Sequence, residues 1–386
     1  MYRRYLIKRV LNALLNYLII IFLLSLMFNT TAEKSVRTQV QEQVQQEAAR
    51  LKNFTSQQIQ QWKAEREVAL IHRYHPDEQF MLRVFWRTVD TITFRFGNST
   101  IIKSSQGERD VWGIILETLP RTAILFSTAI VIEIVIAIWL GLKKAQRPGG
   151  LLDRSTSIGT MIVYGMPAWW VGMLFIMLFV YIVPIFPSGG MTSIPPRYGF
   201  LGFLDLLYHM ALPLITLVVI GFWGTALLTR NIVLGVLQDD YIMAARARGI
   251  PERRVLLGHT LRTAAPPIIT IALLSLLSSV FGSIILEGIF SWPGMGNLYW
   301  IAVEQNDVPV SLGLLAVTTG LYMAGLVALV IIAVMAVAGQ FLLHSVFHIR
   351  MEEFAFGGGL ILIVTGIRGV FPSPPHGRLH DADHPE

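Results

Sequence analysis

The chain has 386 residues, of which 53% are hydrophobic and only 15% are charged, whereas a soluble domain carries about 25% charged residues. The absence of cysteine excludes disulfides, zinc–thiolate sites, iron–sulfur clusters and cysteine nucleophiles. The formal net charge of +6 would suit a nucleic-acid-binding protein. The basic residues gather at the ends of apolar runs, however, so we interpret the charge as membrane topology and expect no nucleic-acid partner.

Six apolar runs are long enough to cross a hydrocarbon core of about 30 Å as helices. In chain order they are residues 10–28, 115–142, 157–183, 207–229, 266–290 and 310–342. No small-residue cleavage site follows the first run, so we expect it to be retained as a span rather than removed as a signal peptide. The predicted fold is an all-α polytopic membrane protein with six transmembrane helices.

The short loops between these runs divide by charge. Two of them are rich in basic residues, which are Lys143, Lys144, Arg147 and Arg154 in one, and Arg230, Arg246, Arg248, Arg253, Arg254 and Arg262 in the other. The loops 184–206 and 291–309 together contain a single basic residue, Arg197. Basic residues mark the cytoplasmic side of a membrane protein. We therefore expect both termini in the cytoplasm, and we expect the chain in the cytoplasmic membrane of a prokaryote.

Residues 29–112 form a long insertion after the first span, predicted to be extracytoplasmic. Residues Ala32–His72 lack Gly and Pro, and their spaced apolar residues predict an amphipathic helix. Such a helix either docks an external partner or packs on its own domain, and we favour the second interpretation. The expected domains are residues 1–28 (amino terminus and first span), the extracytoplasmic segment 29–112, a transmembrane core at 113–343 and a cytoplasmic tail at 344–386.

The connection at residues 240–265 is the most informative part of the chain. Asp240 is expected to cap a short helix, Gly249 to end it in a left-handed conformation, and Pro251 to occupy the first position of a second helix. Pro266 and Pro267 are expected to break that second helix before the fifth span. The sequence therefore predicts a helix, a sharp turn and another helix lying along the inner membrane surface.

The residues of this connection carry a specific resemblance. The string Asp240-Tyr241-x-x-Ala244-Ala245-Arg246-Ala247-x-Gly249, followed by Arg253, Arg254, His259, Leu261, Arg262 and Pro267, resembles the EAA loop of ABC-importer permeases. It is most similar to the first permease subunit of the dipeptide, oligopeptide and nickel importers. Glu287-x-x-Phe290-x-x-Pro293-Gly294-x-Gly296 resembles the outer turn after span five in the same family, and Met166-Pro167 resembles its third span.

The resemblance implies a function for the loop. In that family the short helix inserts into a groove of a separate ATP-binding subunit and passes that subunit's movement to the spans. The residues expected to form this coupling joint are Asp240, Tyr241, Ala244, Ala245, Arg246, Ala247, Gly249, Arg253 and Arg254. The implied partners are a second homologous permease, two ATP-binding subunits, an extracytoplasmic substrate-binding protein and membrane lipid. The implied cargo is a di- or oligopeptide, with an oligosaccharide or a nickel complex as alternatives.

Other chemistries find little support in the residues. No phosphate-binding Gly-x-x-x-x-Gly-Lys-Ser/Thr string is present, so ATP hydrolysis falls to another polypeptide and we expect no catalytic residue and no cofactor here. Glu133 and Glu287 lie in apolar runs and leave an ion-coupled carrier open, although two isolated acids more closely resemble hydrogen-bonding groups between helices. His376, His380 and His384 have helical spacing, but the prolines around them argue against a metal site.

Overall fold

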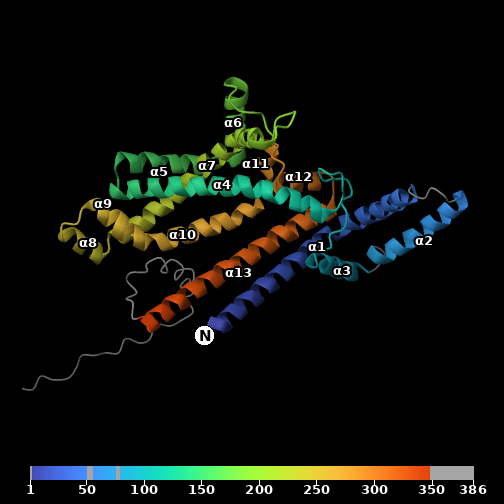
Figure 1. The fold of residues 1–386 in the computed structure, drawn as a ribbon, viewed down its shortest axis with the longest axis horizontal. Helices are drawn as coiled ribbons and strands as arrows, with labels where there is room; N and C mark the ends of the chain where they lie inside the picture. The colour runs from blue at the N-terminus through green and yellow to red at the C-terminus, as the bar shows by residue number, and fades with distance from the viewer. Residues whose placement is uncertain (1, 50–54, 75–78, 348–386) are drawn as a thin grey trace, which may run out of the picture. The chain divides into compact units, whose positions relative to one another are not determined.

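The computed structural model describes residues 2–49, 55–74 and 79–347, and His376, His380 and His384 of the tail lie outside them. Regular secondary structure in these residues is helical, apart from one isolated bridge between Asn98 and Asp110. The all-α prediction is therefore confirmed (Figure 1). The chain divides into two compact units, one made of residues 3–234 and 272–327 and the other of residues 235–271 and 328 onward, and each unit is described by itself.

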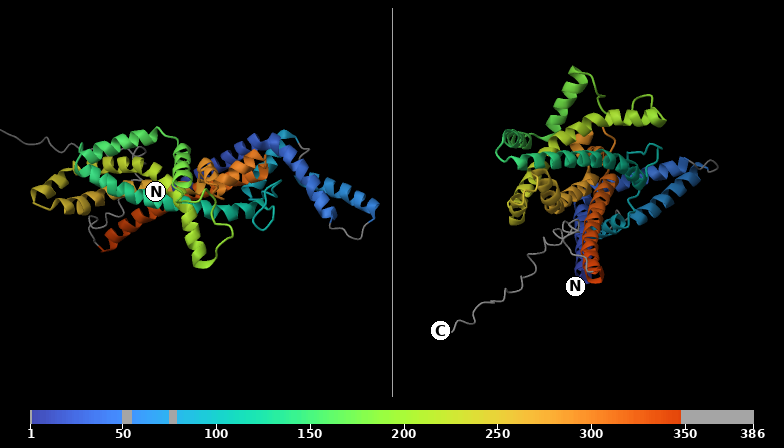
Figure 2. Two further views of the ribbon diagram at one scale, coloured as in Figure 1. Left: turned by 90° about the horizontal axis from the view of Figure 1, so that it is seen from above. Right: turned by 60° about the vertical axis from the view of Figure 1, so that its left-hand side comes forward.

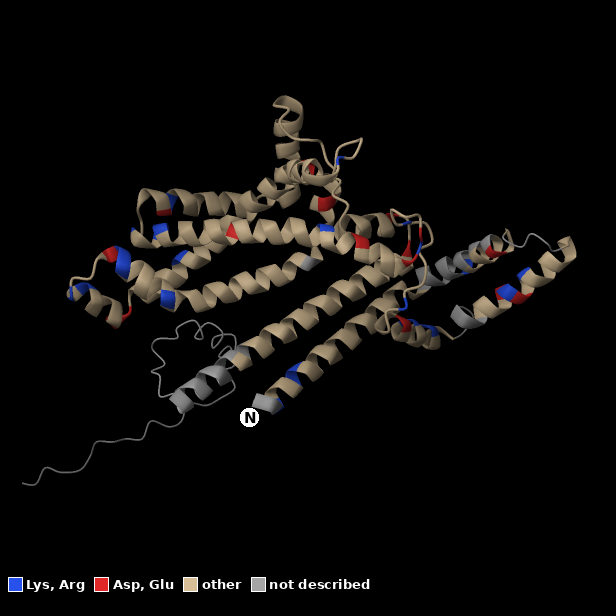
Figure 3. Cartoon of the chain, in the orientation of Figure 1, with Lys and Arg blue, Asp and Glu red and all other residues tan. Residues whose placement is uncertain are grey.

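Among the described residues, five helices contain a stretch that is long and apolar enough to span a membrane, and a bent pair, taken as one span, makes a sixth. They are α1 (Tyr2–Ala49), α4 (Val111–Gln146), α7 (Gly199–Leu237), the continuous run of α9 (Glu252–Arg254), η2 (Val255–Thr260) and α10 (Leu261–Ser278), and α13 (Val308–Phe347). Charged residues are sparse along the middle of these helices and gather near their ends and in the connections (Figure 3). The predicted number of spans is thus confirmed.

The third predicted span is a bent pair rather than one straight helix. It consists of α5 (Leu151–Tyr164) and α6 (Ala168–Ile176), the latter extended by the π-helical turn η1 (Met177–Ile182), and the two halves meet at 96°. Figures 1 and 2 show α6 turned away from the direction of α5. Pro167 lies at the bend, where it has no N–H to donate and disfavours the helical conformation of the residue before it.

The insertion after the first span begins as a continuation of that span. The helix α1 runs without a break to Ala49, and α2 (Ser56–Tyr74) and α3 (Phe80–Ile92) follow. The single helix expected at Ala32–His72 is therefore wrong, since its two halves belong to α1 and α2. Val40, Val44 and Leu70 are buried together, and a bidentate pair joins Arg66 to Glu47. The expectation that this segment packs on its own domain is confirmed.

The fifth span ends earlier than its apolar run suggests. The helix α10 stops at Ser278, and a 3-10 turn, η3 (Ser279–Phe281), leads to Gly282, which has a φ of 62°. Glycine adopts such an angle at no steric cost. Ser283 then caps α11 (Ile284–Ile289) by accepting a hydrogen bond from the Leu286 amide, and α12 (Met295–Glu304) follows. The predicted end of the span at residue 290 is therefore wrong, because the last residues of the apolar run form the separate short helix α11.

In the larger unit, α4 packs along α7 in a parallel orientation. Leu125 and Phe126 of α4 cluster with Met210 of α7, and farther along Ala137 and Leu140 cluster with Ala226. Close approach is possible because Gly141 faces Thr229, where a methyl group would overlap that side chain. On the other side of the unit α1 runs antiparallel to α13, with Tyr17 beside Gly320 and Leu24 and Phe28 against Val308 and Leu312.

Candidate functional site

The connection between α7 and α10 folds as a helix, a turn and a second helix, as predicted. Its first helix is α8 (Asp240–Ala247), and Gly249 follows with a φ of 74°. The Gly249 amide donates to the Arg246 carbonyl (2.9 Å) and the Ile250 amide donates to the Ala245 carbonyl (3.3 Å). This pair of bonds is the Schellman arrangement, in which a left-handed residue satisfies the last carbonyls of a helix. The role predicted for Gly249 is confirmed.

The two caps of this connection lie one residue away from their predicted positions. Asp240 is the first residue of α8, and Asp239 is its cap, with a φ of −68°, a ψ of 143° and no side-chain cap hydrogen bond. Pro251 likewise precedes α9 as its cap, with a ψ of 136°, so its expected place as the first helical residue is wrong. Asp239 and Asp240 still lie at the N-terminus of α8, where negative charge is favoured.

Pro266 and Pro267 do not break the helix, contrary to prediction. The chain stays helical from Glu252 to Ser278, with both prolines inside α10. The wider π-helical turn η2 comes directly before α10, and Thr270 donates to the Pro266 carbonyl at 3.0 Å. Wide turns and neighbouring hydroxyl groups let membrane helices retain prolines. The second helix of the connection therefore continues directly into the fifth span.

The helix α8 has one inward and one outward face. Ile242 and Ala245 are buried, at 0% and 2% exposure, and α8 contacts η2, on which Val255 and Leu256 are also buried. The exposed stripe follows helical spacing and consists of Asp240, Tyr241, Met243, Ala244 and Ala247 of α8, continued by Arg248 directly after it. Of the three alanines expected in the coupling joint, Ala244 and Ala247 are exposed, whereas Ala245 packs inward.

Two side-chain pairs hold α8 to the second helix. Arg246 forms a bidentate pair with Glu252, at 3.1 Å (Nε to Oε2) and 2.7 Å (Nη2 to Oε1), and this hydrogen bonding raises the pKa of the Arg246 guanidinium. The Tyr241 hydroxyl donates to Thr263 at 2.8 Å. Arg253 and Arg254 are exposed. The connection thus forms an elbow of two helices. The small side chains of Ala244 and Ala247 and the basic side chains of Arg253 and Arg254 are exposed on it.

A buried ionic cluster lies in the larger unit near the end of α7, and the sequence analysis missed it. Arg230 of α7 pairs with Asp153 of α5 at 2.7 Å, and the Gly149 amide donates to the same carboxylate oxygen. The side chain of Lys144 is fully buried, and its Nζ lies 4.0 Å from the other Asp153 oxygen. Neither Lys144 Nζ nor that oxygen has a hydrogen-bond partner among the described residues. The sequence analysis interprets Lys144 and Arg230 only as markers of the cytoplasmic side. The signal for an ionic cluster was Asp153, an acidic residue within a basic loop.

The motif around Glu287 forms a second buried cluster, a hydrogen-bonded network. It lies between the spans that end at Ser278 and begin at Val308. The Glu287 side chain accepts from the amides of Gly296 (2.8 Å) and Asn297 (3.1 Å) in the first turn of α12. Its other oxygen accepts from Thr122 of α4 at 3.1 Å, and the Thr122 hydroxyl accepts from the Met295 amide. Burial raises the pKa of Glu287, and these hydrogen bonds partly oppose the rise. A side chain at Gly294 would overlap Thr122 and Glu287, which explains the glycine of the motif.

Glu133 also connects two helices. Its carboxylate accepts from Thr225 of α7 at 2.7 Å and lies where a side chain at Gly221 would be. The interpretation of both acids as hydrogen-bonding groups between helices is therefore confirmed.

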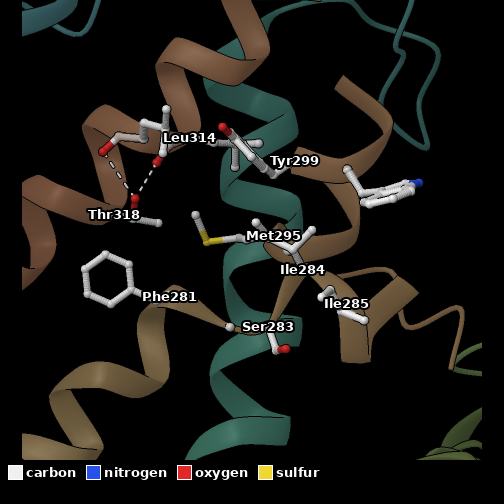
Figure 4. Close-up of a pocket in the computed structure, with 12 residues that line it drawn as sticks. Phe281, Ser283, Ile284, Ile285, Met295, Tyr299, Leu314 and Thr318 are labelled. Atoms are coloured by element: carbon white, nitrogen blue, oxygen red, sulfur yellow. Dashed lines mark hydrogen bonds between the residues drawn. The ribbon is translucent and has the colours of Figure 1, made fainter. Parts of the chain in front are cut away.

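An apolar cavity of about 630 Å³ lies beside the Glu287 network. Figure 4 shows the side chains of Phe281, Met295, Tyr299 and Leu314 around it. The Thr318 hydroxyl at its edge donates to the carbonyls of Leu314 and Leu315. No charged side chain lines the cavity, so it offers no ionic contact to the charged ends of a peptide.

Comparison with known proteins gives a family match over most of this architecture. The model of the family described as binding-protein-dependent transport system inner membrane component matches residues 133–347, which include the whole connection and the Glu287 motif. The chain is 33% identical to the oligopeptide transport system permease protein AppB of Bacillus subtilis over 230 residues, which are 60% of this chain and 71% of that protein.

Two further relatives show the same range of similarity. The peptidoglycan transport system permease protein YejB of Agrobacterium fabrum is 35% identical over 61% of this chain and 64% of its own length. The di/tripeptide transport system permease protein DppB of Pseudomonas aeruginosa is 33% identical over 54% of this chain and 67% of its own length. The chain thus spans about two thirds of the length of the curated relatives that it matches.

Proposed function

We propose a function from the premise that this chain belongs to the family of binding-protein-dependent transport system inner membrane components: the exposed stripe of α8 is the joint that couples the permease to an ATP-binding subunit. The chain is a multi-pass membrane permease of this family, and it supplies the path rather than the energy. A separate subunit hydrolyses ATP, and the complete importer contains two such subunits, a second homologous permease and an external binding protein. Both termini lie in the cytoplasm of a prokaryote.

The geometry of α8 is the observation that supports this coupling. Ala244 and Ala247 project no side chain beyond a methyl group, so a partner backbone can approach α8 closely. The buried pair Ile242 and Ala245 anchors α8 to its own loop, and the Arg246–Glu252 pair fixes its angle to the second helix. Because the second helix continues into the fifth span without a break, a force applied to α8 reaches that span through one continuous helix.

Di- or oligopeptides are the proposed cargo. Support comes from the relatives, two of which are named for oligopeptides and for di- and tripeptides, whereas a third is named for peptidoglycan. An oligosaccharide or nickel cargo keeps the same machinery and changes only the external binding protein. An ion-coupled carrier would need a titrating acid in the path, and Glu133 is instead engaged by Thr225 between two helices.

The proposal is tested by placing a charge on the exposed stripe. Ala244→Glu is expected to insert and fold normally but to reduce copurification of the ATP-binding subunit at least tenfold, equivalent to about 1.4 kcal/mol of binding. Peptide-stimulated ATPase activity, measured with the binding protein in liposomes, should fall accordingly. Gln238→Glu is the matched control, because it adds the same charge at an exposed residue outside α8.

Normal assembly and transport by Ala244→Glu would refute the coupling role. Transport driven by an ion gradient in the absence of any ATP-binding subunit would instead support the ion-coupled alternative.

A further inference from the structure

The short helix α3 in the insertion has an unusual distribution of side chains. Its large apolar residues are exposed, with Met81 at 65%, Phe85 at 54% and Trp86 at 38%. Its buried positions carry Val84 together with two hydroxyl side chains, Thr88 and Thr91. A helix that faced water would bury its aromatic residues and expose its hydroxyl groups. The environment of α3 is therefore apolar on its outer side.

The polar side of α3 is attached to the end of the first span. Arg87 donates to the Asn29 side chain at 3.1 Å, and Asn29 is the fully buried last residue of the apolar stretch Arg4–Asn29. Burial, with a contribution from neighbouring Arg83, lowers the pKa of Arg87 to about 10, so it remains charged at neutral pH. The Thr88 hydroxyl is satisfied within the helix by the Val84 carbonyl. The bond to Asn29 fixes α3 at the depth at which α1 leaves the hydrocarbon region.

Other contacts place two more span ends at this depth. Ser99 donates to Asp307 at 2.5 Å, which joins the segment after α3 to the residue that precedes α13. Phe94 packs edge-to-face on Trp112 at the start of α4, with ring centroids 5.5 Å apart, and both rings are partly exposed. Trp and other amphipathic aromatic residues favour the membrane–water interface. The end of the apolar stretch of α1 also exposes large apolar side chains, among them Phe22, Leu23 and Met27.

We propose that α3 is an in-plane membrane helix whose exposed face is immersed in the acyl-chain boundary of the leaflet at which the apolar stretch Arg4–Asn29 of α1 ends. A helix with an aromatic face and a polar edge adopts this position in a bilayer. Arg83 and Asp90 lie together on one edge of α3 by helical spacing. A protein partner is the less suitable occupant, since Met81, Leu82, Phe85 and Trp86 are neighbours on this face by helical spacing and no polar side chain lies between them.

The chain contains no cysteine, so a single spin label reports on one position without background. Labels at Met81→Cys and Phe85→Cys would test the apolar face, and a label at Gln79→Cys, an exposed polar residue just before α3, would serve as the control. The experiment uses the assembled transporter in phospholipid liposomes. Electron paramagnetic resonance then compares collisions of each label with oxygen, which concentrates in lipid, and with a water-soluble nickel chelate.

The expected result is an oxygen-to-nickel collision ratio several-fold higher at positions 81 and 85 than at position 79. Equal ratios at all three positions would place α3 in water and overturn the proposal. Protection of positions 81 and 85 from both reagents would also overturn it, because a protein partner would then cover this face. Two independent positions keep the test valid if one variant does not fold.

Discussion

The turn around Glu287 and the connection around α8 both join long apolar helices, but they are stabilised in opposite ways. The Glu287 carboxylate is 1% exposed and is satisfied by two backbone amides and a hydroxyl group. The Arg246–Glu252 pair of the connection has side chains that are 35% and 57% exposed. Buried networks of this kind rigidify a structure, whereas exposed ion pairs contribute little. The comparison indicates a fixed turn around Glu287 and an elbow that is open to a partner.

Removal of the Glu287 side chain should have the largest effect on this comparison. Glu287→Ala leaves the amides of Gly296 and Asn297 and the Thr122 hydroxyl without their acceptor, and we expect the free energy of unfolding to fall by about 3 kcal/mol. Unfolding in detergent micelles would measure the change. Glu287→Gln retains an amide oxygen for the two backbone donors and should lose less than about 1 kcal/mol. An alanine variant as stable as the glutamine variant would contradict the network.

The buried cluster at the end of α7 comes next. Asp153→Asn leaves the buried Lys144 and the partly exposed Arg230 without their counter-ion and should cost about 2 kcal/mol of unfolding free energy. Lys144→Met removes an amine that has no hydrogen-bond partner among the described residues and should be neutral or slightly stabilising. Thermal unfolding of the two variants provides the measurement. Equal destabilisation by both would show that Lys144 is a full partner of Asp153.

A smaller effect is expected at the turn of the elbow. Gly249→Ala forces a side chain into the left-handed region and should destabilise the loop by about 1 kcal/mol. Gly258→Ala is the matched control, because Gly258 has an ordinary φ and ample space for a methyl group. Hydrogen exchange of the α8 amides would locate the change, which should be faster in the first variant alone. Unchanged exchange in Gly249→Ala would contradict the importance of this turn.

The pH dependence of stability isolates the charge of Glu287. Its pKa is raised above the ordinary value of 4.5, so the folded protein keeps a proton that the unfolded chain releases. The contribution to stability is therefore complete below pH 4.5, declines as the pH rises towards the folded pKa, and levels off above it. Unfolding of wild type and Glu287→Gln across this range should show the decline only in the wild type. Parallel curves would assign the pH dependence to another group.

The exposed pair of the elbow should matter least for stability. A double-mutant cycle of Arg246→Ala and Glu252→Ala is expected to give a coupling energy below about 1 kcal/mol, which salt reduces further. The same variants should weaken coupling to the ATP-binding subunit more than they weaken folding. A coupling energy of several kcal/mol between Arg246 and Glu252 would mean that the elbow is as rigid as the turn around Glu287.

The sequence predicted the parts of this molecule that depend on local chemistry. Apolar run lengths identified the spans, and the conformational freedom of glycine identified the turn at Gly249. The errors arose where distant residues decide the outcome. Pro266 and Pro267 remain inside a helix that continues from the wide turn η2, and Ala245 is buried together with Ile242 on a helix that contacts η2. The Lys144–Asp153–Arg230 cluster joins three helices, and no local pattern reveals such a meeting.

The most direct test of the coupling claim is a footprint of the elbow, which the cysteine-free chain makes straightforward. Single variants Ala247→Cys, on the exposed stripe, and Gln238→Cys, outside it, would be labelled with a water-soluble maleimide, with and without the ATP-binding subunits. The account predicts that assembly slows labelling at position 247 at least tenfold and leaves position 238 unchanged. Equal labelling of position 247 in the free and assembled permease would contradict it.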